Sequence, residues 1–213
     1  WRYTRMRALA ISVEGATERE FVKQILQPHL SAYGWEKVTP ISLDGKVSIE
    51  RVSAEIQKLL KMAKYTHVTT LYDLYGFKNY KDCTADAVEM AIYSAVQSNS
   101  QSKLHPYVQR HEFEALLFSN PELLAAHFKQ DKDGLKQLRQ ALKVSGHEPE
   151  DINHGVHTCP SRRLKNAFPS YDKVRHGAEL SKQIGLKKIR EHCPRFNHWL
   201  TTLEKLGTSC TES

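Results

Sequence analysis

The sequence contains no long hydrophobic run and no paired cysteine motif. No apolar stretch approaches the ~18–20 residues that a membrane helix requires, which excludes an integral membrane protein with helical spans. The four cysteines, Cys83, Cys159, Cys193 and Cys210, form no CxxC pair, so neither a disulfide framework nor a cysteine-rich zinc site is expected. The apolar segment 8–13 is too short for a signal peptide. We therefore expect a cytoplasmic protein without membrane contact.

Two common catalytic signatures are also missing. Segment 44–48 (DGKVS) lacks the first glycine and the Lys-Ser/Thr pair of a phosphate-binding loop, so the chain has no ATPase site of its own. No GxSxG motif is present, which leaves an α/β-hydrolase without support. The 213 residues, of which 40% are hydrophobic and 26% charged, instead indicate an ordinary globular protein that can bury a sizeable core.

Positive charge is concentrated towards the carboxyl end. Residues 160–213 contain 11 basic and 5 acidic side chains, a surplus of six, whereas residues 1–159 contain 20 and 19, a surplus of one. Such a distribution is typical of a surface that binds a polyanion such as nucleic acid. A solvated basic surface explains it equally well.

Apolar strand-like segments alternate with amphipathic helices in the first half of the chain. Strands are expected over 7–13, 37–43, 66–72 and 106–109, with helices over 17–34, 47–62 and 84–96. This alternation predicts a parallel sheet with crossover helices. Further helices are expected over 112–118, 121–128, 134–144, 177–184 and 194–206, with a loop over 146–161. We divide the chain into an α/β core, 7–118, and a helical extension, 119–207, packed on that core.

Acidic residues follow three of the predicted strands. Glu14, Asp73 and Glu112 each lie just past a strand's carboxyl end, which is the edge where open parallel sheets place their active sites. Carboxylates gathered there repel one another unless a cation joins them, and oxygen ligands suit Mg²⁺ or Mn²⁺. Such ions support phosphodiester cleavage. We therefore expect these three carboxylates to share a cation.

Three further acids have alternative interpretations. Glu18, four residues after Glu14, can point at the same cation or can stabilise the start of the helix that begins near Thr17. For Glu20 the helix-capping interpretation is preferred. Glu114 is either an additional ligand or a solvated helix residue.

Several segments together resemble a known family. Segment 13–18 (VEGATE) resembles the VEGxTE signature that opens Toprim-like nuclease domains, the metal-binding fold of topoisomerases, primases and OLD (overcoming lysogenisation defect) nucleases. Segments similar to a Toprim-like family described as a domain of unknown function are YDLYGF (72–77), HEFEALLF (111–118), PSRRL (160–164), YDK (171–173) and HG (176–177). The resemblance covers roughly residues 7–185. Members of that family commonly occur beside an ABC- or SMC-like ATPase in bacterial anti-phage and abortive-infection systems.

The resemblance implies a Toprim-like four-stranded parallel sheet flanked by helices, with a helical C-terminal extension, in a Mg²⁺- or Mn²⁺-dependent endonuclease. Glu14 and Glu18 match two acids of the pattern, and Asp73 matches the first aspartate of its DxD element. The second DxD position is Tyr75 in this chain. Glu112, or alternatively Glu114, is the candidate for the missing ligand.

The resemblance also implies basic site residues and partners. OLD-type sites use a lysine late in the domain to contact the scissile phosphate, and Lys165 and Lys173 are both candidates. Arg162 and Arg163 are candidates for binding nucleic-acid phosphates, with a solvated pair or an intramolecular ion pair as the alternative. The implied partners are DNA or RNA and a separately encoded ABC- or SMC-like ATPase. The alternative function, which Tyr75 favours, is a degenerate Toprim-like subunit that docks on an ATPase or nucleic acid without cutting.

Overall fold

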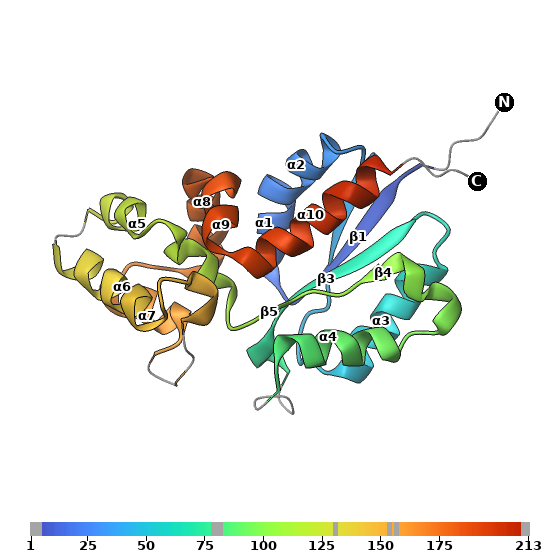
Figure 1. The fold of residues 1–213 in the computed structure, drawn as a ribbon, viewed down its shortest axis with the longest axis horizontal. Helices are drawn as coiled ribbons and strands as arrows, with labels where there is room; N and C mark the ends of the chain where they lie inside the picture. Colours follow the sequence, from blue (N-terminus) through green and yellow to red (C-terminus); the bar gives the residue numbers. More distant parts are fainter. Residues whose placement is uncertain (1–5, 78–82, 130–131, 153–154, 156–157, 210–213) are drawn as a thin grey trace. The chain divides into compact units, whose positions relative to one another are not determined.

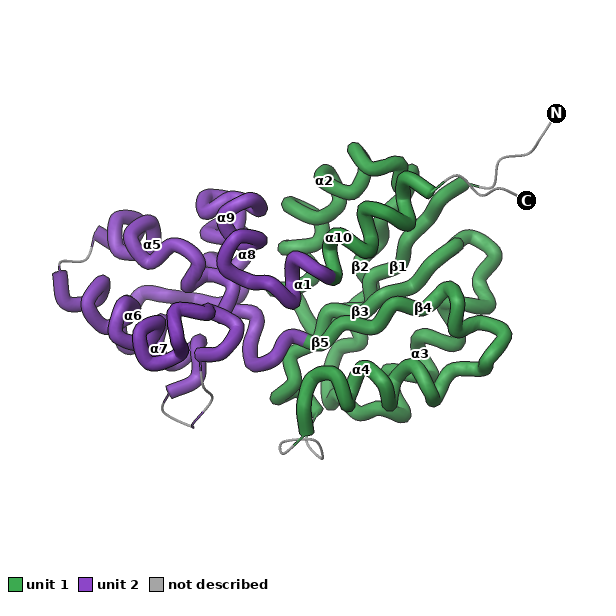
Figure 2. Tube along the Cα trace, viewed as in Figure 1, with its two compact units in different colours: residues 1–108, 199–213 green, residues 109–198 purple. Residues whose placement is uncertain are grey.

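The structure, a computed structural model, consists of two compact units. It describes residues 6–77, 83–129, 132–152, 155 and 158–209 (Figure 1). Unit 1 comprises the chain up to Val108 together with the residues from Trp199 onwards, and unit 2 comprises residues 109–198 (Figure 2). This division differs from the expected one, because residues 109–118 belong to unit 2 and the end of the last helix belongs to unit 1.

Unit 1 is built on a parallel sheet with the strand order β2-β1-β3-β4, and β5 also pairs with β3. The strands are β1 (Ala8–Val13), β2 (Lys37–Ser42), β3 (His67–Asp73), β4 (Leu104–His105) and β5 (Val108–Gln109). Val13 at the end of β1 pairs with Leu71 near the end of β3, so the carboxyl ends of these two strands lie side by side. The expected parallel α/β sheet is confirmed.

Helices cover both faces of this sheet. They are α1 (Ala16–Phe21), a π-helical turn (Val22–Leu26), α2 (Gln27–Ser31), α3 (Ile49–Lys61), α4 (Ala85–Ser94) and α10 (Pro194–Thr208), with 3-10 segments over Leu74–Gly76 and Ser98–Lys103. Figure 1 shows α3 and α4 on one face and α1, α2 and α10 on the other. Successive strand residues point to opposite faces, so β1, buried along its whole length, has an apolar sequence without alternation.

The fourth predicted strand is interrupted at Pro106. The sequence predicted a strand over 106–109, whereas β4 ends at His105 and β5 begins at Val108. Proline lacks the N–H that a ladder position requires. Beside the interruption, the Thr70 hydroxyl accepts a hydrogen bond from the N–H of Tyr107 at 2.8 Å and donates one to its carbonyl at 2.8 Å. A side chain thus replaces the missing backbone bonds and keeps the segment attached to β3.

The end of α10 belongs to unit 1 because one of its faces contacts the sheet layer. The Trp199 indole N–H donates to Thr69 Oγ1 at 2.8 Å, and the Trp35 indole N–H donates to the carbonyl of Leu203 at 2.8 Å. A β-carbon at Gly207 would lie 2.6 Å from Nε1 of Trp35, so the close approach requires glycine. Positions 199, 203 and 207 are four residues apart and therefore share a helix face.

Unit 2 is helical. Its elements are 3-10 segments over Phe113–Ser119 and Pro149–Asp151, the start of α10, and the helices α5 (Pro121–His127), α6 (Lys132–Val144), α7 (Pro160–Ala167), α8 (Lys173–Ile184) and α9 (Leu186–His192). Glu150 caps α10, because its buried carboxylate accepts the N–H of Arg195 at 2.8 Å and of Phe196 at 3.1 Å. Helices α7 and α9 were not predicted, and α7 begins inside the expected loop over 146–161.

Two expectations from composition concern membranes and cysteines. In the part of the chain that the structure describes, no helix is both long and apolar enough to cross a membrane. Cys83, Cys159 and Cys193 are free thiols, and burial raises the pKa of Cys193. Cys210 lies outside the described residues.

His67 and His105 form a partly buried pair on β3 and β4, with ring centroids 5.5 Å apart. Burial lowers the pKa of both imidazoles, to about 4 for His105, and the positive charges of Lys103 and Arg7 lower that of His67 further. The unfolded chain, with an ordinary histidine pKa of about 6.5, binds more protons than the folded chain between those two values. Stability therefore falls as the pH drops through this window.

The variant His105→Asn removes this titration. Between about pH 7 and about pH 4.5, we expect the wild type to lose about 1–2 kcal/mol more free energy of unfolding than the variant, measured by urea denaturation. His147→Asn, which changes an exposed histidine, serves as the control and should lose as much as the wild type. Equal losses in the wild type and in His105→Asn would show that the pair does not control acid stability.

Candidate functional site

Glu14 lies at the sheet edge between the end of β1 and the start of α1. Its Oε2 atom is buried, although the residue as a whole is half-buried. A β-carbon at Gly76 would lie 2.7 Å from Oε2 and 3.2 Å from Cδ of Glu14. Any side chain at position 76 would therefore displace the carboxylate. The backbone of the segment after β3 forms a cradle for the Glu14 carboxylate.

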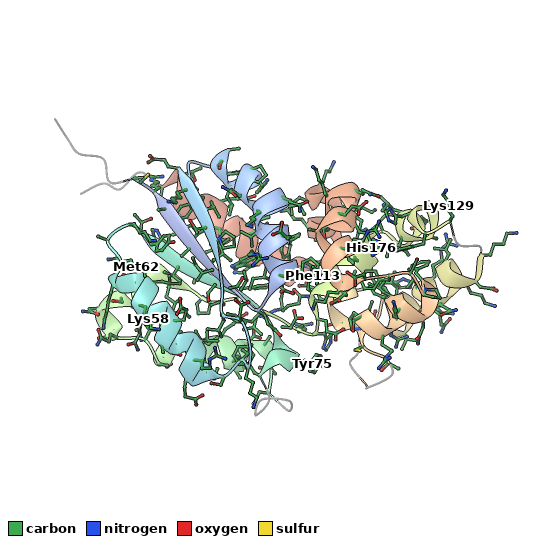
Figure 3. The ribbon with its side chains drawn as sticks, turned by 180° about the vertical axis from the view of Figure 1, so that it is seen from behind. Lys58, Met62, Tyr75, Phe113, Lys129 and His176 are labelled. Atoms are coloured by element: carbon green, nitrogen blue, oxygen red, sulfur yellow. The ribbon has the colours of Figure 1, made fainter. Side chains whose placement is uncertain are left out.

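Asp73 belongs to the same edge. It is the last residue of β3, is 6% exposed and stands three residues before Gly76. Because β1 and β3 are neighbouring parallel strands, the acids that follow their carboxyl ends lie at one edge of the sheet. Tyr75, in the turn between Asp73 and Gly76, is half-buried (Figure 3). The structure thus brings Glu14 and the segment 73–76 together.

Glu18 caps the start of α1, whereas Glu20, for which the same role was expected, lies near the end of the helix. Glu18 is 3% exposed, and its Oε2 accepts the backbone N–H of Gly15 at 3.1 Å. The helix-capping interpretation therefore accounts for one oxygen of Glu18. Glu20 pairs at the surface with Lys23 at 3.2 Å, and this hydrogen bond lowers the pKa of Glu20.

A buried phenol lies beneath the edge. The Tyr72 hydroxyl is 2.8 Å from Ser12 Oγ, and both side chains are completely buried. Burial raises the pKa of Tyr72 strongly, its hydrogen bond with Ser12 opposes the rise, and the negative charges of Glu55 and Glu14 add to it. Tyr72 is therefore a neutral group beneath the acidic edge.

Glu112 lies in unit 2 and contacts the first turn of α7. Its Oε2 accepts the backbone N–H of Ser161 at 2.8 Å, and its Oε1 accepts the Ser161 hydroxyl at 3.0 Å. A carboxylate at a helix start is favourable because it satisfies an orphan N–H and the helix dipole is positive there. Glu112 thereby joins segment 111–118 to segment 160–164.

Glu114 is completely buried in unit 2, which contradicts the interpretation as a solvated helix residue. Its Oε2 lies 3.4 Å from Nζ of Lys173, and its Oε1 accepts the Tyr171 hydroxyl at 3.4 Å. Burial raises the pKa of Glu114, and Lys173 opposes this shift. Lys165 donates to the carbonyl of Tyr171 at 2.8 Å. Both candidate lysines thus have contacts within unit 2.

The two arginines of the PSRRL segment differ in exposure. Arg162 is exposed, whereas Arg163 is half-buried and its Nε–H donates to the carbonyl of Thr158. The alternative of a simple solvated pair therefore does not describe Arg163.

The expected acids are divided between the units. Glu14, Glu18 and Asp73 lie in unit 1, and Glu112 and Glu114 lie in unit 2. Over the described ranges, no group of three or more His, Cys, Asp or Glu side chains is arranged to hold a metal ion. A cation shared by Glu14, Asp73 and Glu112 stays a prediction.

Sequence reasoning did not identify Gly76 or Ser161. For Gly76 the only signal was a glycine in the short turn after a strand, which marks a close backbone approach as readily as an ordinary loop. Ser161 is 49 residues from Glu112, and no local pattern connects the two. Both positions matter through contacts that only the folded chain creates.

We expect Glu112→Ala to lower the free energy of unfolding by roughly 2 kcal/mol, because α7 loses a charged acceptor for two hydrogen bonds. Thermal or urea denaturation measures this change. Glu122→Ala is a suitable control, because it removes an exposed ion pair with Arg139 and should cost under ~1 kcal/mol. If both variants are equally stable, Glu112 is not a structural residue.

Comparisons with known proteins identify similar sequences and folds. A family model described as Domain of unknown function (DUF4276) matches residues 13–204. No curated protein sequence matches the chain. Among solved structures, the C-terminal region of the Burkholderia pseudomallei OLD protein is 14% identical, with a TM-score of 0.55, over 95% of this chain and 98% of that one. The corresponding region of the Xanthomonas campestris pv. campestris OLD protein is 15% identical, with a TM-score of 0.46, over 95% and 97%.

At these identities, the likeness to the Burkholderia structure establishes the fold alone. The chain has the Toprim-like α/β fold of the OLD C-terminal region, as the sequence resemblance implied. The family model spans most of the chain, from the end of β1 into α10. The protein therefore belongs to the family Domain of unknown function (DUF4276).

Proposed function

We propose that this protein is a metal-dependent nuclease that hydrolyses phosphodiester bonds. The observation that carries the proposal is the carboxylate of Glu14, held against Gly76 at the sheet edge that Asp73 shares. The parallel pairing of β1 and β3 places both carboxylates at one edge of the sheet, and carboxylate oxygens are ligands that suit a hard cation. The likeness of the fold to the OLD C-terminal region supports the proposal at the level of architecture.

The donor atoms at this edge fit a hard divalent cation. Mg²⁺ is usually held in proteins by one or two carboxylates and completes its coordination with water and substrate phosphates, so a cluster of three protein ligands is not required. Glu14 and Asp73 would hold Mg²⁺ or Mn²⁺, with Glu18 beside them. When bound, the ion supplies positive charge that stabilises the transition state of phosphodiester cleavage.

Other residues of the chain orient these groups. Gly76 leaves room for the Glu14 carboxylate, and the hydrogen bond from Gly15 to Glu18 fixes the turn between β1 and α1. Tyr75, half-buried next to Asp73, carries an aromatic face of the kind that stacks on nucleic-acid bases. The exposed Arg162 offers a charge for substrate phosphates.

We further propose that the nuclease is the effector of an anti-phage or abortive-infection system with a separately encoded ABC- or SMC-like ATPase. The support is the sequence resemblance to a family whose members commonly occur beside such an ATPase. Recovery of this chain alone when it is purified from its native operon would contradict the association.

One set of observations favours the alternative, a catalytically degenerate binding subunit. Glu112 and Glu114, the candidates for the ligand missing at Tyr75, both have bonding partners within unit 2. Neither has to bind metal to account for its burial or its contacts. A binding subunit would retain the fold and the basic residues while lacking hydrolysis.

The variants Glu14→Gln and Asp73→Asn remove one negative charge each with little change in shape. In the presence of Mg²⁺ or Mn²⁺, we expect either variant to cleave plasmid DNA or tRNA at least ~100-fold more slowly than the wild type. This corresponds to about 3 kcal/mol of transition-state stabilisation. Nucleic-acid affinity should be unchanged or slightly higher, because repulsion of phosphate decreases.

Glu20→Gln provides the control, because Glu20 lies on α1, the helix that follows Glu14, and pairs at the surface with Lys23. It should cleave as the wild type does. If Glu14→Gln or Asp73→Asn cleaves as fast as the wild type, the nuclease assignment is rejected and the binding subunit remains as the function.

A further inference from the structure

A polar cleft of about 540 Å³ lies between α6 and α7 of unit 2. Six polar residues line it: Asp133, Lys136, Gln137, Gln140, Arg163 and Asn166. The apolar part of its lining is the buried Leu138. Two cationic side chains, three amides and one carboxylate, that of Asp133, therefore line one cavity.

A close helix contact fixes the walls of the cleft. A β-carbon at Gly134, near the start of α6, would lie 2.9 Å from the ring of Phe168 and 3.1 Å from the carbonyl of Ala167, at the end of α7. Only glycine allows the two helices to approach this closely. The cleft is thus a feature of packed helices.

The two helices contain most of the protein's excess positive charge. Together they carry seven basic side chains and one acidic side chain, a surplus of six, in a chain whose formal net charge is +7. The basic residues are Lys132, Lys136, Arg139, Lys143, Arg162, Arg163 and Lys165. Such a field attracts a polyanion over a Debye length of about 8–10 Å.

Three positive charges of α6 form a stripe along one face of the helix, and Lys136 in the middle of this stripe lines the cleft. Lys132, Lys136, Gln140 and Lys143 recur at intervals of three or four residues and therefore share one helix face. The stripe is roughly 16 Å long at 1.5 Å per residue, which corresponds to about five phosphates along one DNA strand. Arg139 has a different partner: it forms an exposed ion pair with Glu122 at 2.9 Å.

On the basis of the nucleic-acid substrate of the proposed function, we propose that the α6–α7 cleft binds the phosphodiester backbone of that nucleic acid. Lys136 and Arg163 contact phosphates, and the amides of Gln137, Gln140 and Asn166 donate hydrogen bonds to phosphate and sugar oxygens. Lys136 and the three amide residues are exposed, so the cleft is open to solvent. An open stripe of charges suits an extended polymer better than a single enclosed nucleotide.

The test measures binding separately from cleavage. Fluorescence anisotropy in EDTA determines the affinities for labelled single-stranded DNA, duplex DNA and an RNA hairpin over a series of salt concentrations. We expect Lys136→Gln to bind about 5–10-fold more weakly near 100 mM salt, with a salt slope smaller by about 0.7–0.9. Gln140→Trp fills the cleft without changing its charge, so it should weaken binding several-fold and leave the slope unchanged.

Arg139→Gln is the matched control, because it removes the same charge from the same helix at a residue that pairs with Glu122. It should change affinity less than about twofold. Equal effects of Lys136→Gln and Arg139→Gln, or no effect of Gln140→Trp, would overturn the cleft as the binding site. Failure of the wild type to bind any of the three oligonucleotides would also overturn it, and direct binding of labelled polyglutamate would then indicate an acidic protein partner.

The binding test of the cleft and the cleavage test of the acidic edge can fail independently of each other. If Glu14→Gln loses cleavage but Lys136→Gln binds as tightly as the wild type, the cleft is rejected as the binding site and the nuclease assignment is retained. If Lys136→Gln binds more weakly than the wild type but the wild type does not cleave, the cleft is retained as the binding site and the nuclease assignment is rejected.

Discussion

The carboxylate of Glu14, held against the backbone of Gly76, is the contact on which the proposed function depends. β1 and β3 pair in parallel and end together, so the acids that follow them are forced to the same edge of the sheet. Like charges at one edge repel, and burial of an oxygen of Glu14 adds a desolvation cost. In the proposed function, a divalent cation bound at this edge would offset both costs. The positive charge of such an ion would then be available to the phosphate of a substrate.

In unit 2 the charged motif residues hold segments of the chain together. Glu112 binds the first turn of α7, and buried Glu114 meets Tyr171 and Lys173 from the segment that leads into α8. The three motif segments 111–118, 160–164 and 171–173 therefore meet in one network. The motif residues therefore have different roles in the two units. Glu14 and Asp73 form an acidic edge in unit 1, whereas Glu112 and Glu114 join segments of unit 2. The exposed basic side chains of α6 and α7 do not take part in this network.

The sequence predicted the sheet and the acidic edge because both follow from local patterns. Apolar β-branched runs mark β1 and β3, and Glu14 and Asp73 can be placed by their position at the strand ends. Helix α7 was missed because it has only eight residues, begins at a proline and carries four charged or amide side chains, which leaves few apolar residues to mark it. Pro106 splits the fourth strand, and the replacement of its ladder bonds by Thr70 is a tertiary contact that no pattern shows. The same limit applies to Glu112, whose partner Ser161 is distant in the sequence.

Binding of Mn²⁺, measured by isothermal titration calorimetry without nucleic acid, tests most directly whether the edge of Glu14 and Asp73 is a metal site. The account predicts that the wild type binds Mn²⁺ and that Glu14→Gln does not. It also predicts that Gly76→Ala, which keeps every carboxylate but would place a methyl group 2.7 Å from Oε2 of Glu14, binds at least about tenfold more weakly, a loss of about 1.4 kcal/mol. Equal affinities of the wild type, Glu14→Gln and Gly76→Ala for Mn²⁺ would contradict it.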